Sequence, residues 1–90
     1  MDKVALLSLS NDLKRITTSI QRGSKENADR FNKEAVRWLN ESKSAKDIYI
    51  KKLLVKVEET LKLENDLRKA EDCLMYSVLL QNRALSGEKN

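Results

Sequence analysis

The chain has 90 residues, enough for one domain, with 18 lysines and arginines against 14 acidic residues and a net charge of +4. It contains two glycines and one cysteine, but no proline and no histidine. This composition excludes most β architectures, which need frequent glycine and proline turns, and it excludes disulfide scaffolds and thiol-based zinc sites.

The first predicted element is a helix over residues 3–22. Large aliphatic residues recur in it at spacings of three and four, which places them on one stripe of a helix. This stripe consists of Leu6, Leu9, Leu13, Ile16 and Ile20. Most of the residues between them are polar. Gly23 then suits the left-handed conformation that ends many helices, and Ser24 suits the cap of the next helix.

The second predicted element is a helix over residues 25–43. Phe31, Ala35 and Trp38 repeat at helical spacing, and the alternation of small and large side chains suits packing against the first helix. Because only a short connection separates the two helices, we expect an antiparallel hairpin. Its predicted core joins these three residues to the aliphatic stripe of the first helix.

The third predicted element is a helix over residues 45–86. Residues 40–47 before it contain no glycine or proline, so either Ser44 caps a new helix or the second helix continues through. The third helix also contains no glycine or proline before its last residue, and it would be about 60 Å long. Its apolar stripe changes face near Leu61–Leu63, which indicates different neighbours for its two halves. The fold class expected is all-α: a helical hairpin plus a long C-terminal helix, of the coiled-coil or helical-bundle type.

Residues 73–80 are the most apolar stretch, since seven of these eight residues are apolar. On a helix they point in every direction and need cover all round. A hairpin of two short helices cannot reach the far end of a 60 Å helix, so we expect another protein chain to cover it. The alternative is that the long helix folds back and this stretch is bundle core. The predicted partner interface comprises Leu67, Leu74, Met75, Tyr76, Val78, Leu79 and Leu80.

The residues available for catalysis are few. Without histidine there is no imidazole general base or ligand. Cys73 follows two acidic residues and has apolar neighbours otherwise, which suppresses the thiolate, so we expect a core cysteine. No phosphate-binding or calcium loop motif is present. We therefore expect no enzymatic activity, no metal and no cofactor.

Five lysines with one acidic residue among them make residues 43–56 the best candidate for a phosphate-facing surface. They are Lys43, Lys46, Lys51, Lys52 and Lys56. The stretch contains no arginine for bidentate base recognition, so a solvated lysine face is favoured. The same lysines suit an acidic membrane surface, but no tryptophan or phenylalanine anchors the opposing aliphatic stripe.

These observations predict a non-catalytic protein–protein interaction module, a small coiled-coil scaffold or assembly subunit. We expect it to oligomerise through apolar helix faces, with itself or with another helical protein. A small basic nucleic-acid-associated regulator and an amphipathic membrane-surface adaptor are the alternatives. No apolar segment has the length of a signal-peptide core or a membrane span, so we expect the cytoplasm or the nucleus.

Overall fold

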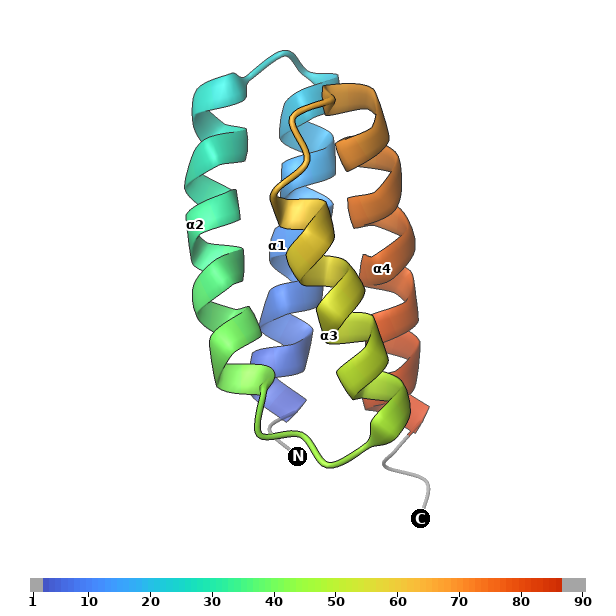
Figure 1. The fold of residues 1–90 in the computed structure, drawn as a ribbon. Helices are drawn as coiled ribbons and strands as arrows, with labels where there is room; N and C mark the ends of the chain where they lie inside the picture. The colour runs from blue at the N-terminus through green and yellow to red at the C-terminus, as the bar shows by residue number, and fades with distance from the viewer. Residues whose placement is uncertain (1–2, 87–90) are drawn as a thin grey trace.

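The computed structural model describes residues 3–86, which form four helices joined by short connections (Figure 1). They are α1 (Lys3–Gln21), α2 (Lys25–Ser42), α3 (Ile48–Leu61) and α4 (Asp66–Ser86). Successive helices run in opposite directions, and each packs against two neighbours in the cyclic order α1, α2, α3, α4. No strand occurs in these residues, so the predicted all-α class is confirmed for them.

The turn between α1 and α2 has the chemistry expected of it. Gly23 adopts a φ of 74°, the left-handed conformation. Its N–H donates to the carbonyl oxygen of Ile20 at 3.0 Å, and the N–H of Ser24 donates to that of Ser19 at 2.9 Å. These bonds satisfy carbonyl groups at the end of α1. Ser24 occupies the N-cap position of α2, although its side chain makes no capping hydrogen bond.

The connection between α2 and α3 is a break, so the continuous-helix interpretation of this stretch is wrong. Asp47, rather than Ser44, caps α3: its Oδ1 accepts from the backbone N–H groups of Tyr49 and Ile50 at 2.8 and 3.3 Å. Its Oδ2 accepts from Nη2 and Nε of Arg83 in α4, at 2.7 and 3.0 Å. These bonds from Arg83 hold the pKa of Asp47 below its ordinary value. One carboxylate thus starts α3 and ties it to the end of α4.

The prediction of one long helix over residues 45–86 is wrong, because the chain turns back after α3. The turn begins where the N–H of Leu63 donates to the carbonyl oxygen of Thr60 at 3.0 Å. It ends at Asn65, whose Oδ1 accepts from the backbone N–H of Arg68 at 2.9 Å and so caps α4. The predicted change of apolar face near Leu61–Leu63 coincides with this turn. The helix break uses a capping asparagine instead of the glycine or proline that often ends a helix.

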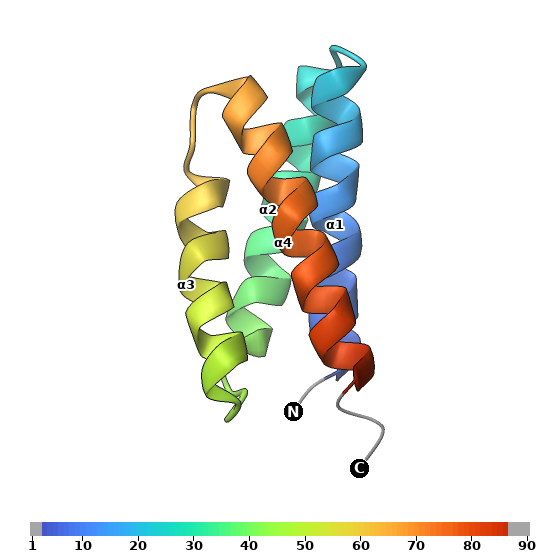
Figure 2. The ribbon, with the colours of Figure 1, turned by 90° about the vertical axis from the view of Figure 1, so that its right-hand side faces the viewer.

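Because α4 turns back along the bundle, the molecule is more compact than a hairpin with one projecting helix would be. Its principal extents are 41 × 20 × 18 Å and its radius of gyration is 12.4 Å, close to the value of about 12 Å expected for a compact chain of this length. The last helix therefore lies beside α1 instead of projecting from the hairpin (Figure 2). The alternative in which residues 73–80 fold into the bundle is correct in part, as their exposure shows below.

The core lies between the four helices and is centred on the aliphatic stripe of α1. Leu6, Leu9, Leu13 and Ile16 are buried there, and so is Ala35 of α2. The other predicted hairpin-core residues are partly buried and pack against this cluster: Ile20, Phe31 and Trp38. The second half of the chain completes the core with Ile50, Leu53, Leu54, Val57, Leu61, Cys73, Leu80 and Ala84.

Small polar residues of α1 are buried as well, on the side that contacts α4. Ser10 Oγ donates to the carbonyl oxygen of Ser77, and Thr17 Oγ1 donates to that of Ala70, both at 2.7 Å. All four residues are buried. Because the facing side chains are small, the two backbones approach closely enough for hydroxyl groups to reach main-chain carbonyls. Polar residues of α1 such as Ser10 and Thr17 are therefore not solvent-exposed, because α1 packs against α2 on one side and α4 on the other.

Candidate interaction surface

The residues predicted to bind a partner all lie on α4, and the structure divides them. Leu80 is fully buried in the core, so placing it at an interface is wrong. Tyr76 and Leu79 are partly buried and pack against the core. The others are exposed: Leu67, Leu74, Met75 and Val78. The cause is that α1 and α3 cover two sides of α4 and leave its outer side uncovered.

The exposed apolar residues of α4 form a line along the helix. Four side chains are 73%, 46%, 44% and 43% exposed, in the order Leu67, Leu74, Val78 and Leu85. At 3.6 residues per turn they fall within an arc of about 40°. We call these four residues the outer stripe of α4, the helix nearest the viewer in Figure 2. Leu85 is absent from the predicted interface, although its heptad spacing from Val78 could have identified it.

Two polar residues complete the heptad pattern of the outer stripe. Glu71 and Gln81 occupy the intervening positions, so that the spacing from Leu67 to Leu85 is four, three, four, three and four. Lys14 of α1 donates from Nζ to Oε1 of Gln81 at 2.6 Å. An ammonium group thus lies beside one end of the stripe, and an exposed carboxylate lies near the other.

The five lysines predicted to face phosphate do not form an uninterrupted basic surface. Lys43 Nζ lies 3.6 Å from Oε1 of Glu58, and Lys56 Nζ lies 3.9 Å from Oε2 of Glu59. The other three are exposed: Lys46, Lys51 and Lys52. Because carboxylates lie among these lysines, the positive potential that a nucleic-acid backbone requires is reduced here.

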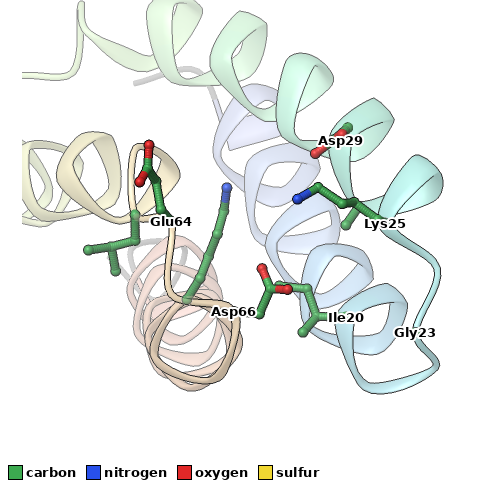
Figure 3. Close-up of a pocket in the computed structure, with 9 residues that line it drawn as sticks. Ile20, Gly23, Lys25, Asp29, Glu64 and Asp66 are labelled. Carbon is green, nitrogen blue, oxygen red and sulfur yellow. The ribbon is translucent and has the colours of Figure 1, made fainter.

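A cavity of about 440 Å³ opens at the end of the bundle, between the α1–α2 turn and the α3–α4 connection (Figure 3). It forms because α3 is shorter than the other helices and stops before their ends. Lys25 and Asp29 of α2 line it, together with Glu64 and Asp66 from the opposite wall. Lys69 of α4 lines it too, half-buried, and donates from Nζ to the carbonyl oxygen of Leu61 at 3.1 Å. Since its wall carries charges of both signs, the cavity favours neither an anion nor a cation.

Two ionisable side chains are buried in the described residues. Cys73 is fully buried, as expected, and burial raises the pKa of its thiol to about 12, which leaves it inert as a nucleophile. Asp12 is also buried. Burial, and after it the Glu34 carboxylate, raise the pKa of Asp12 to about 6, against the opposing effect of Arg15. Neither group lines the cavity at the end of the bundle.

Within residues 3–86, no group of three histidine, cysteine, aspartate or glutamate side chains is placed to hold a metal ion. None of the four helices described combines the length and apolar character needed to cross a membrane. Comparisons with protein-family models, with curated proteins and with solved structures give no match.

Proposed function

We propose that this chain is a non-catalytic protein–protein interaction module that binds a helical surface through the outer stripe of α4. The observation that carries the proposal is the alignment of Leu67, Leu74, Val78 and Leu85 on one exposed line of one helix. Single apolar residues are common on protein surfaces. A line of them at heptad spacing is instead the pattern by which one helix packs against another.

The outer stripe is distinct from the residues that bury α4 in the bundle. The buried face of α4 is a separate set of residues: Ala70, Cys73, Ser77, Leu80 and Ala84. Burying an exposed aliphatic side chain contributes about 1.5–3 kcal/mol, and a half-exposed one contributes about half of that. The four exposed fractions sum to about two whole side chains, so the stripe offers roughly 3–6 kcal/mol of burial to a partner, which is a reason for a helix to dock there.

Photo-cross-linking tests this proposal. A photoreactive amino acid is placed at position 74, in the outer stripe, and in a control variant at position 55. Val55 is a fitting control because it is 59% exposed, but on α3. Each variant is irradiated in extracts of cells that normally make the protein.

We expect discrete cross-linked species from position 74 and none from position 55, because the stripe aligns four exposed aliphatic residues along one helix. Equal patterns from both positions, or no adduct from position 74, would show that α4 has no dedicated interaction surface.

A further inference from the structure

The outer stripe and its two intervening polar residues show the same order of apolar and polar residues in either chain direction. Such a pattern is complementary to a second copy of itself. Resting on the proposed function, we infer that the stripe binds the same stripe of a second copy of this chain, with the two α4 helices antiparallel. Residues whose numbers sum to 152 then face each other. Leu67 faces Leu85 of the partner subunit, and Leu74 faces Val78 of the partner subunit. The remaining pair is Glu71 with Gln81 of the partner subunit.

Each of these pairs is chemically matched. Aliphatic residues meet aliphatic residues, and the one carboxylate meets an amide. In heptad notation every pair joins an a position to a d position, which is how antiparallel helices form their core layers. A two-fold axis needs a surface that is complementary to itself, and this stripe meets that requirement.

The opposite orientation is disfavoured by Glu71. In a parallel pair each residue of the stripe, and each of the two intervening polar residues, faces its own copy, so two Glu71 carboxylates would meet inside an apolar contact. Like charges brought together in a desolvated contact are unfavourable. The antiparallel arrangement separates the two carboxylates by the ten-residue step from position 71 to position 81, a distance of about 15 Å along the helix axis.

The surroundings of Gln81 suit an incoming carboxylate. Lys14 Nζ donates to Oε1 of Gln81 at 2.6 Å, a bond that uses neither N–H donor of the Gln81 amide. The ammonium group of Lys14 adds positive charge at the same place. Glu71 of the partner subunit would therefore meet an N–H donor and a cation, and the reciprocal contact repeats this across the two-fold axis.

The flanks of the stripe allow a second helix to approach. On the side towards α1 the next residues are Ala70, Ser77 and Ala84, which are small and buried. On the other side Met75 lies level with the two-fold axis, where it meets Met75 of the partner subunit. A small-residue flank and a flexible thioether both permit close packing.

Disulfide trapping tests the register. Two single variants are made, Leu67→Cys and Leu85→Cys, with Cys73 left in place because it is buried in the core. In the antiparallel pair, positions 67 and 85 of opposite subunits lie within disulfide range. Two copies of either single position are instead about 27 Å apart.

Under mild oxidation we expect the mixture of the two purified variants to form a cross-linked dimer and each variant alone to remain uncross-linked. Efficient cross-linking of each variant alone would indicate the parallel pair and overturn the inference. Absence of cross-linking in the mixture at millimolar protein would exclude the second copy as partner.

Sedimentation of the purified chain provides the second measurement. One helix pair is a small interface, so we expect a dimer with a dissociation constant on the order of 10–100 µM, with twice the 10.4 kDa monomer mass. Val78→Asp should weaken it about tenfold or more, because it places a charge in the central layer. The matched control Val55→Asp should leave it unchanged.

The two proposals fail separately. If the purified chain stays monomeric while position 74 still forms adducts in cell extracts, the stripe binds another protein and only the second-copy inference is wrong. If position 74 forms no adduct in cell extracts and the purified chain also stays monomeric, the interaction surface itself is wrong.

Discussion

Asp12 places a carboxyl group in the interior of the bundle, on the turn of α1 that lies near Glu34 of α2. Its Oδ1 lies 3.5 Å from Nη1 of Arg15, while its Oδ2 has no hydrogen-bond partner. A buried polar atom without a partner destabilises a fold by about 1–3 kcal/mol. The pKa of about 6 follows from this environment, because protonation removes the charge that burial disfavours.

We predict that the pH dependence of stability between pH 5 and pH 8 depends on Asp12. Its pKa is raised from 3.8 when unfolded to about 6 when folded. The folded state therefore binds the proton more tightly, so the stabilisation from protonation is fully present below about pH 4 and is lost as pH rises through 6. Asp12→Asn should be more stable than the wild type at pH 8, by about 1 kcal/mol, and should lose most of this dependence. Urea denaturation at both pH values measures the effect.

The control for this prediction is Asp29→Asn, an exposed change on α2, which should retain the pH dependence of the wild type. The chain has no histidine to titrate in this range. Asp47 has a pKa below 3.8, so its stabilising contribution is lost only at lower pH. If Asp12→Asn retained the pH dependence of the wild type, the carboxyl group would not be titrating near pH 6.

Helix boundaries decide the fold at the scale of the elements, and two side-chain caps set them. Asp47 starts α3 and Asn65 starts α4. Aspartate and asparagine are strong N-caps because a side-chain oxygen accepts a backbone N–H that has no partner within the helix. Neither break contains glycine or proline. A prediction that relies on those two residues to find helix ends therefore gives one long helix, where the chain forms two antiparallel helices.

We predict that Asn65→Ala destabilises the protein by about 1 kcal/mol, because the N–H of Arg68 loses its acceptor. Asn65→Asp should remain close to the wild type in stability, since aspartate caps equally well and its charge favours the start of a helix. Thermal denaturation of the two variants followed by circular dichroism distinguishes them. Equal losses in both would mean that the asparagine side chain does not set this boundary.

At the scale of the whole molecule, α4 is an integral part of the bundle. It bonds to α1 through Ser77 and Ala70, which are 67 and 53 residues away in the chain from Ser10 and Thr17. Its buried face completes a core that the first hairpin begins. A change in the buried face of α4 should therefore destabilise all four helices together, whereas a change in the outer stripe should not.

Leu80 and Leu74 test this difference with the same substitution. Leu80→Ala should destabilise the monomer by about 2–5 kcal/mol, because it opens a cavity in the core, and all helices should unfold in one transition. Leu74→Ala should remain within about 0.5 kcal/mol of the wild type when measured on the monomer. Urea denaturation at low protein concentration provides both values. A mild effect of Leu80→Ala would show that α4 is only loosely attached.

The sequence by itself determined the helical class, the α1–α2 hairpin with its glycine turn, and the face of α1 that packs in the core. These follow from local spacing and from the conformational freedom of Gly23, which need no information about distant contacts. The tertiary structure alone decided which apolar residues of α4 are core and which are surface. Leu80 and Leu74 are equally apolar, and only the positions of α1 and α3 around the helix bury the first and expose the second. The same reason explains Ser10 and Thr17, whose burial depends on the approach of a helix that the chain forms more than fifty residues later.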